Sequence, residues 1–393
     1  MSSKLAVVLS HPTQYYSPWF RWLRARTALQ FRVFYLWESG VTVQRYPQFQ
    51  AAFKWDVDLL SGYDHEFVRN TARTPGTGHF WGLRNPALTA RLAEYRPDAV
   101  LMFGYAYASH LHAICWARWR GLPLVFRGDS HFIGRPSPGW RRALPLRLLY
   151  RQFAAVTYVG QANREYFRTL HVPDTRLFFA PHAVNQELFD PTRPEHHKAA
   201  EALRGQLGIA RSDRVVLFAG KLIPAKQPRE LLEAFLALNL PNTSLVMVGD
   251  GPESTALREQ ARAAPAGRVH FLPFANQSEM PARYLMADVF ALPSRGLYET
   301  WGLAINEAMH MGLPCLVSDR VGCQQDLVSD GETGWVFRTE DPGHLRGKLS
   351  GALTEDLTPF KPRVAARIAG YTYEHATTGL LAALDSLPKH QRA

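Results

Sequence analysis

Two glutamates flank the expected start of a helix late in the chain, in LPSRGLYETWGLAINEAMHMGLPCLVSD, residues 292–319. Glu299 precedes this helix, which we expect to begin between Thr300 and Leu303, and Glu307 lies inside it. A helix start presents free N–H groups and the positive end of the helix dipole, and both favour phosphate. A carboxylate inside the helix can accept hydrogen bonds from a ribose diol. A carboxylate before the helix can contact a sugar attached to that phosphate.

Two other motifs in the same half follow expected strands. AGKLIPAKQP, residues 219–228, brings Lys221 and Lys226 to the end of one strand, where their ammonium groups can hold a diphosphate without a metal. VGDGPE, residues 248–253, places a glycine turn at the end of the next strand. The alternative is that the first glutamate only caps a turn and the second is a solvated helix residue. The lysines and the glycine turn favour the ligand site over this alternative.

Short apolar runs rich in β-branched residues must position these side chains. In the first half they cover 4–10, 31–37, 98–104, 122–128, 154–160 and 176–182, and in the second 214–220, 244–250, 268–274, 288–294, 314–319 and 334–337. Their alternation with helical segments is typical of parallel sheets covered on both faces. The sequence therefore predicts an α/β fold with two doubly wound, Rossmann-like domains. Their facing cleft is the default ligand site.

The bulk composition indicates a folded protein of the reducing cytoplasm. The 393-residue chain has 46% hydrophobic and 20% charged residues, and it is long enough for two cores. Its three scattered cysteines offer neither a metal-ligand spacing nor a disulfide framework. The first apolar run is too short for a signal peptide, and none reaches the roughly 18 residues of a spanning helix. The net charge of +11 suits nucleic acid, anionic lipid or a phosphorylated small molecule, and charge alone does not choose among them.

The second half resembles the retaining family-4 glycosyltransferases with the GT-B fold. The E-x7-E spacing of Glu299 and Glu307 is similar to that family's signature, and AGKLIPAKQP resembles its diphosphate motif. VGDGPE, DVFALPS and DGETGWVF match the family in order and spacing. The resemblance is specific over roughly residues 212–340 and only architectural before them.

Two departures from the family pattern concern donor binding. Lys221 stands where the family usually has arginine, which keeps the charge but loses the bidentate fork. VGCQQD has Cys323 and Asp326 where glycine and glutamate are usual. We expect these changes to affect the strength of donor binding and not its location.

The resemblance implies a donor site in the second domain. Lys221 and Lys226 would bind the diphosphate, Glu307 the ribose, and Glu299 the donor sugar. The expected donor-binding residues are Gly220, Lys221, Lys226, Gly249, Gly251, Phe274, Glu299, Thr300, Trp301, Gly302, Leu303 and Glu307. The family precedent also implies retention at the anomeric carbon, with no metal and no cofactor.

The first domain is expected to bind the acceptor and to complete the sugar site. In VFRGDSH, Arg127 stands approximately where relatives place a histidine that touches the donor sugar. We therefore count it as a catalytic candidate with Glu299, Lys226 and Lys221. The acceptor or cleft candidates are His11, Gln14, Tyr15, Asp129 and His131. The alternatives are that His11 and Gln14 only fix their loop and that Asp129 is a structural partner of Arg127.

The resemblance implies three parts along the chain. They are an acceptor-binding domain over 1–189, a linker over the polar, proline-bearing stretch 190–211, and a donor-binding domain over 212–370. A C-terminal helix, over about 371–390, is expected to pack back on the first domain.

Three other segments have two interpretations each. SPWFRWLRAR (17–26) and GWRRALPLRLLYRQF (139–153) give helical apolar faces edged with arginine, which either lie on an anionic membrane surface or pack on the sheet. KWDVDLL carries a D-x-D pair, Asp56 and Asp58, that holds a metal in another glycosyltransferase fold. We interpret that pair as structural, because it lies in the wrong domain for the donor.

The expected function is transfer of a sugar from a nucleoside diphosphate, UDP by default, to a hydroxyl of a saccharide or lipid-linked acceptor. The expected role is cell-surface glycan or glycolipid synthesis, in the cytoplasm or on the inner face of its membrane. A nucleotide-sugar epimerase or a sugar phosphorylase of the same fold is the nearest alternative. A basic nucleic-acid-binding protein is the alternative from another class, but it leaves the two glutamates unexplained and the chain has no such module.

Overall fold

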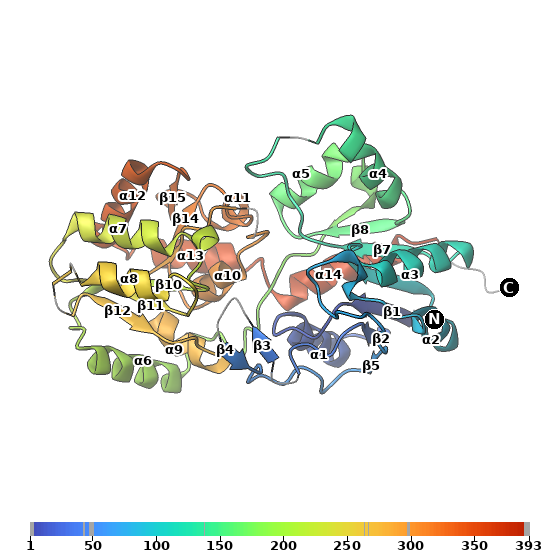
Figure 1. Ribbon diagram of the computed structural model, residues 1–393, viewed down its shortest axis with the longest axis horizontal. Helices are drawn as coiled ribbons and strands as arrows, with labels where there is room; N and C mark the ends of the chain where they lie inside the picture. Colours follow the sequence, from blue (N-terminus) through green and yellow to red (C-terminus); the bar gives the residue numbers. More distant parts are fainter. Residues whose placement is uncertain are drawn as a thin grey trace.

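The computed structural model describes residues 4–41, 44–46, 51–136, 138–262, 264–265, 267–296 and 299–388. In these residues the chain forms two separate parallel sheets, each covered by helices on both faces (Figure 1). The α/β fold with two doubly wound domains is therefore confirmed.

The first sheet has seven strands in the order β5-β2-β1-β6-β7-β8-β9, all paired in parallel. The strands are β1 (Lys4–Leu9), β2 (Gln30–Tyr35), β5 (His65–Phe67), β6 (Ala99–Phe103), β7 (Leu124–Arg127), β8 (Ala155–Tyr158) and β9 (Leu177–Phe179). The helical elements are α1 (Tyr16–Arg26), η1 (Phe80–Gly82), α2 (Leu88–Tyr95), α3 (Ala108–Trp119), α4 (Trp140–Tyr150), α5 (Gln161–Thr169) and η2 (Asp174–Arg176). A separate antiparallel pair joins β3 (Gln44–Tyr46) to β4 (Ala51–Phe53).

The second sheet has six strands in the order β12-β11-β10-β13-β14-β15, again all parallel. The strands are β10 (Arg214–Ala219), β11 (Thr243–Val248), β12 (Val269–Leu272), β13 (Val289–Leu292), β14 (Cys315–Ser318) and β15 (Gly334–Phe337). The helices before and around it are α6 (Pro194–Leu207), η3 (Pro224–Lys226), α7 (Pro228–Leu238), α8 (Ser254–Ala261), η4 (Gln277–Glu279), α9 (Met280–Leu285), α10 (Leu303–His310), α11 (Gln324–Leu327), α12 (Pro342–Thr354) and α13 (Phe360–Ile368).

Every apolar run of the sequence overlaps one strand of these two sheets. The reason is physical: the strands are buried on both faces, so they need continuous apolar sequence. All six residues of β11 are buried, for example. Sequence reasoning missed the short strand β5 and the β3–β4 pair, each strand of which has three residues.

The last helix, α14 (Tyr373–Asp385), returns to the first domain. It contacts β8, β9 and α1, and in Figure 1 it lies in red among the blue and green elements. The indole N–H of Trp19 donates to the hydroxyl of Thr377, 2.9 Å away. Gly379 permits a close approach, because a Cβ there would lie 1.8 Å from the carbonyl oxygen of Phe179. In the segment 190–211, α6 packs against α9 of the second domain.

Each sheet has one place where the order of its strands reverses. In the second sheet β10 lies beside β13, and in the first sheet β1 lies beside β6. Open α/β sheets bind ligands outside the carboxyl ends of the strands at such switch points. Sheet topology alone therefore predicts ligand-binding residues in the loops after β10 and β13 and in those after β1 and β6.

Candidate active site

The loops after β10 and β13 bring a lysine and a glutamate together. Nζ of Lys226, on η3, donates a hydrogen bond to Oε2 of Glu299, and the Ser294 hydroxyl donates to the same oxygen over 3.0 Å. Lys221 lies near both, and burial, followed by the charge of Lys226, lowers the pKa of its ammonium. The switch point of the second sheet therefore carries two lysines and one carboxylate.

Helix α10 begins beside this pair. Gly302 precedes it with φ of +102°, a conformation that glycine adopts most easily. The indole N–H of Trp301 donates to Oδ1 of Asn306 over 2.7 Å, so the first turn holds the tryptophan in place. Helix α10 starts at Leu303, as expected from the sequence, four residues after Glu299.

Glu307 is not a solvated helix residue, so that alternative is wrong. It is 3% exposed, and it accepts hydrogen bonds from Tyr284 Oη at 2.7 Å and Gln277 Nε2 at 3.2 Å. The hydroxyl of Tyr15, from the first domain, donates to the same carboxylate. Burial raises the pKa of Glu307, and these hydrogen bonds lower it in part. Two donors from the second domain and one from the first thus converge on this carboxylate.

The glycine turn after β11 has a packing reason. A Cβ at Gly249 would lie 2.0 Å from the carbonyl oxygen of Gly220, and one at Gly251 would lie 2.4 Å from that of Leu222. The backbone N–H of Leu222 donates to the Asp250 carbonyl over 2.9 Å. The two glycines therefore let this turn pack closely against the loop after β10, which carries Lys221, and hold the backbone of that loop in place. Phe274, after β12, faces the ring of Trp55 with centroids 6.4 Å apart.

The loop after β7 lies against the start of α10. Oδ2 of Asp129 accepts a hydrogen bond from Thr300 Oγ1 over 2.8 Å and lies 3.5 Å from Nε2 of His182. Burial raises the pKa of Asp129, but the contacts with His182 and Thr300 outweigh it and bring that pKa to about 2. His131 lies near the backbone of Glu299. Two of the expected cleft residues, Asp129 and His131, thus lie against the segment between β13 and α10.

Arg127 lies behind that loop and is 2% exposed. Its guanidinium donates to the carbonyl oxygens of Ala180 at 2.8 Å and Pro181 at 3.2 Å, and it lies 5.1 Å from the Trp19 ring. The arginine therefore holds the loop that carries His182, and Asp129 pairs with that histidine and with Thr300. The interpretation of Asp129 as a partner of Arg127 does not describe the contacts observed.

Of the candidates after β1, Tyr15 reaches Glu307 and Gln14 contacts Tyr15. His11 shares a hydrogen bond of 2.9 Å with Ser10 through Nδ1, and its ring lies 6.0 Å from that of Trp37. Burial lowers the pKa of His11 to about 4, so the ring is neutral at pH 7.

Sequence reasoning missed two residues of this region, His182 and Asn306, and it noted Asp326 only as a departure from the family pattern. His182 is buried, and its carbonyl accepts from Asn306 Nδ2 over 3.1 Å. Asp326 accepts from the backbone N–H of Gln161, at the start of α5, over 3.0 Å. The position of His182 as the last residue of the predicted run 176–182 was the available signal. Nothing in the sequence marks the partners of the other two.

Asp56 and Asp58 have structural partners. Asp56 accepts from the backbone N–H of Ser278 in the second domain, and Asp58 accepts from the backbone N–H groups of Leu60 and Ser61. Among the described residues no group of three or more His, Cys, Asp or Glu side chains could hold a metal ion.

A pocket of about 430 Å³ lies between the two domains. Ile133, Gly134, Arg135 and Pro136 line it from the first domain, and Ala225, Arg295, Gly296, Arg320, Thr339 and Glu340 from the second. The pocket adjoins the loop after β10 that carries Lys226, since Ala225 precedes that lysine. Arginine is the commonest residue type in its lining, which suits an anionic ligand.

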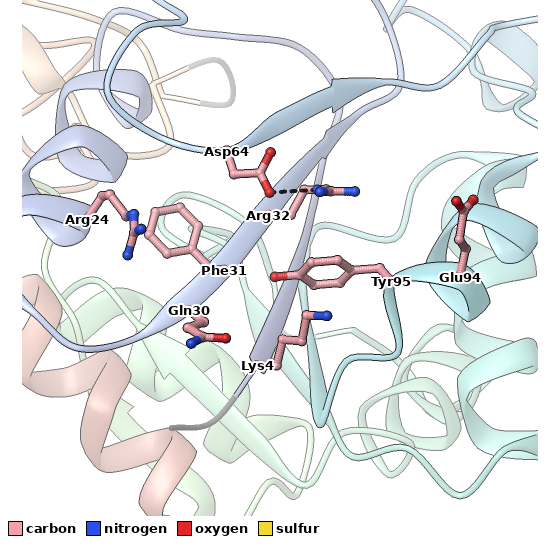
Figure 2. A pocket seen from close by; sticks show the side chains of 8 residues that line it. All are labelled: Lys4, Arg24, Gln30, Phe31, Arg32, Asp64, Glu94 and Tyr95. Carbon is pink, nitrogen blue, oxygen red and sulfur yellow. Dashed lines mark hydrogen bonds and ion pairs between the residues drawn. The ribbon is translucent and has the colours of Figure 1, made fainter. Parts of the chain in front are cut away.

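A second pocket, of about 410 Å³, lies at the opposite edge of the first sheet, where β1 and β2 begin (Figure 2). Nζ of Lys4 lies 4.2 Å from the centroid of the Tyr95 ring, and the guanidinium of Arg32 lies 4.9 Å from it. Arg32 also pairs with Asp64 at 2.8 Å. This pocket lies away from both switch points, and we assign it no role in the reaction.

Comparison with known proteins decides the family. Residues 199–372 match the family described as glycosyl transferases group 1. The chain is also 33% identical over 354 residues to a D-inositol 3-phosphate glycosyltransferase of Nocardia farcinica, covering 80% of this chain and 74% of that protein. The chain belongs to the glycosyl transferases group 1 family. The motifs that resemble this family, Glu299 and Glu307 included, lie in the region that matches.

Other relatives of this chain differ in the substrates that their names give and in length. A GDP-mannose-dependent α-(1-6)-phosphatidylinositol monomannoside mannosyltransferase of Mycolicibacterium smegmatis is 34% identical over 231 residues, 56% of this chain and 59% of that protein. The match with a D-inositol 3-phosphate glycosyltransferase of Mycolicibacterium vanbaalenii spans 42% of that relative. The chain thus spans about half the length of several curated relatives that it matches.

Solved structures confirm the GT-B fold. A glycosyltransferase of Rickettsia africae superposes with a TM-score of 0.76 at 12% identity, over 99% of this chain and 100% of that one. Anabaena Alr3699/HepE, solved in complex with UDP and glucose, gives 0.71 at 18% identity, over 98% of this chain and 100% of that one.

Proposed function

We propose that this glycosyltransferase moves a sugar from a nucleoside diphosphate, UDP by default, to a hydroxyl group of a saccharide or lipid-linked acceptor, with retention and without a metal. Its product would be a cell-surface glycan or glycolipid. The observation that carries the proposal is the meeting of Lys221, Lys226, Glu299 and the start of α10 at one switch point. Two cations and a helix start suit a diphosphate, and the carboxylate suits the sugar that it carries.

The proposed reaction breaks the bond between the anomeric carbon and the phosphate oxygen and forms one from that carbon to the acceptor oxygen. Negative charge develops on the departing diphosphate, where the lysines and the α10 dipole would stabilise it. A phosphate oxygen of the donor would take the proton of the acceptor hydroxyl, so no enzyme nucleophile is required. Glu299 would hold the sugar hydroxyl groups, and Glu307 the ribose.

The first-domain loop supplies the other side of the proposed sugar site. Asp129 and His131 lie beside Thr300 and Glu299, whereas Arg127 is buried behind them. We therefore propose that Asp129 or His131 contacts the donor sugar or the acceptor. Arg127 would act as a positioning residue through the loop that it holds.

A donor screen tests the proposal. UDP, GDP and ADP sugars would be added separately to the protein, and the melting temperature and the release of nucleoside diphosphate measured. One nucleotide class should stabilise the protein, by about 2.7 kcal/mol at 100 times its dissociation constant. NMR of the transfer product then reads the anomeric configuration, which should match that of the donor. A chain stabilised by none of these sugars, or a product with inverted configuration, would contradict the proposal.

A further inference from the structure

Two helices of the first domain combine aromatic, apolar and basic residues, and the structure treats them differently. On α1, Trp19, Phe20 and Leu23 are at most 2% exposed and belong to the core between the first sheet and α14. On α4, Trp140 is 70% exposed, and Leu144 and Leu148 are each 49% exposed. The apolar face of α1 is thus buried in the core, whereas that of α4 is exposed to solvent.

The exposed residues of α4 form one stripe. Trp140, Leu144 and Leu148 are spaced at i, i+4 and i+8, so their side chains lie on one face of the helix. The opposite face holds the helix on the sheet through Ala143 and Tyr150, each 1% exposed. The stripe is therefore additional to the apolar surface that the fold requires, and Figure 1 shows α4 at the periphery of the first domain.

Neighbouring elements extend this apolar surface. Helix α3 packs on the same face of the sheet as α4, since both contribute to one core cluster. Its outer side exposes Trp119 by 79% and Leu111 by 38%. Trp81, 62% exposed, lies on η1, which contacts α3. We call the outer sides of these two helices, with η1, the α3–α4 surface. Apolar exposure of this kind marks an interaction site.

The charge of the same region has one sign. Between residues 99 and 164 the only acidic residue is Asp129, which faces Thr300 and His182 in the other direction. The arginines on or beside the two helices are Arg118, Arg120, Arg135, Arg141, Arg142, Arg147 and Arg151. None of them forms an ion pair within the described residues. Two guanidiniums lie over the exposed tryptophans, Arg120 at 5.2 Å from Trp119 and Arg141 at 5.3 Å from Trp140.

We propose that the α3–α4 surface binds an anionic lipid membrane. Leucine and tryptophan side chains on one helical face enter the boundary between headgroups and acyl chains, and surrounding arginines contact lipid phosphates. Charge complementarity selects this occupant, because an acidic membrane surface offers a continuous array of phosphates to a face without carboxylates. In the part of the chain that the structure describes, none of the helices has the length and apolarity that crossing a membrane requires.

The position of α4 connects this surface with the proposed reaction. The segment that precedes the helix carries Gly134, Arg135 and Pro136, which line the pocket between the domains. A lipid-linked acceptor held in the membrane would therefore have its polar head near the interdomain pocket. This connection rests on the proposed function, whereas the lipid contact itself does not.

Vesicle flotation tests the lipid contact directly. The full-length protein would be mixed with vesicles of phosphatidylcholine alone or with phosphatidylglycerol added, and the bound fraction measured. The protein should float with the anionic vesicles and not with the neutral ones. Arg141→Gln with Arg142→Gln should weaken binding by at least about tenfold, since each arginine near an anionic surface contributes on the order of 1 kcal/mol.

Two variants complete the design. Arg211→Gln with Arg262→Gln removes the same charge from exposed positions of 91% and 76% on other elements, and it should leave binding unchanged. Trp140→Ser with Leu144→Ser and Leu148→Ser should abolish insertion, read as loss of the tryptophan blue shift on anionic vesicles. Because these side chains are exposed, melting temperatures should stay within the range of the wild type.

Four outcomes would overturn the proposal. The first three are equal binding to neutral and anionic vesicles, equal loss in both arginine pairs, and an α3–α4 surface occupied by a second copy of the chain, seen as dimers that the serine variant converts to monomers. Preferential binding of an oligonucleotide over anionic vesicles would assign the surface to nucleic acid instead and equally overturn it. Donor binding, measured in the same samples without lipid, separates this proposal from the proposed function, because the α4 variants should bind nucleotide as the wild type does.

Discussion

Lys226 and Glu299 form a hydrogen-bonded ion pair across the loops that follow β10 and β13. Their side chains are 20% and 12% exposed, so water screens the pair only in part. The two residues are expected to contact neighbouring parts of one donor, the diphosphate and the sugar. The pair fixes their relative position, and a diphosphate would become the second anion beside Lys226.

Loss of Lys226 should weaken binding of the nucleoside diphosphate itself. A charge-assisted hydrogen bond contributes on the order of 1.5–3 kcal/mol, so Lys226→Ala should lower the affinity about 10- to 150-fold. The variant also leaves the Glu299 carboxylate without its cation, which adds repulsion toward phosphate. Calorimetry with the free nucleotide measures the effect. Lys198→Ala, at an exposed position of α6, is the matched control, and unchanged affinity in a folded Lys226→Ala would remove this lysine from the site.

Loss of Glu307 should weaken the free nucleotide and the intact donor equally, because the ribose does not change during the reaction. A double-mutant cycle isolates this contact: the nucleotide and its 2′- and 3′-deoxy forms would be titrated into the wild type and Glu307→Gln. A deoxy form should bind the wild type more weakly and the variant no worse than the full nucleotide does. If the wild type and Glu307→Gln distinguish the nucleotide from its deoxy forms equally, Glu307 accepts hydrogen bonds only from its buried protein donors and not from the ribose.

Turnover should continue in EDTA. The lysines and the start of α10 supply the positive charge that a metal would otherwise bring to the diphosphate. Asp56 and Asp58 already accept backbone hydrogen bonds, and those from Leu60 and Ser61 lower the pKa of Asp58 to about 2. Activity abolished by chelation and restored by Mn²⁺ would disprove this account of the site.

Asp326 should make the protein less stable as the pH rises from 3.8 toward 6. Burial raises the pKa of this carboxyl from 3.8 to about 6, although hydrogen bonds from Gln161 and Tyr371 lower it in part. The unfolded chain therefore loses its proton first, and ionisation within this window favours unfolding. This loss in the free energy of unfolding is absent below pH 3.8 and reaches about 3 kcal/mol above pH 6.

Asp326→Asn removes this titration and can still accept the Gln161 N–H. Its free energy of unfolding, measured in urea and expressed relative to the wild type, should rise by on the order of 2–3 kcal/mol between pH 4 and pH 6.5. A flat difference across that range would mean that Asp326 ionises in the folded protein as easily as it does in water.

The sequence predicted those features that depend on local pattern. The strands were visible because burial on both faces requires continuous apolar runs, and the start of α10 was expected between Thr300 and Leu303, where the structure has it. Contacts between domains left no such pattern. Asp129 accepts a hydrogen bond from Thr300, which lies 171 positions away in the chain, and no local sequence pattern at either residue predicts this contact.

Burial was the other quantity that pattern could not supply. SPWFRWLRAR and GWRRALPLRLLYRQF have similar composition, yet α14 and the sheet cover the first, whereas no described element covers Trp140. Arg127 was expected to face the donor because it stands approximately where relatives place a histidine that touches the donor sugar. Two carbonyl groups of the 180–181 loop instead take up its guanidinium.

The most direct test of the central claim uses Glu299→Gln, which keeps the size of the side chain and removes its charge. Affinity for the free nucleoside diphosphate and the rate of sugar transfer would be measured on the same preparation. The account predicts that nucleotide affinity does not weaken, because Lys226 loses a competing carboxylate, while the transfer rate falls at least about tenfold for loss of a charge-assisted contact to the sugar. A variant that loses nucleotide affinity as Glu307→Gln does, or that transfers sugar at the wild-type rate, would contradict it.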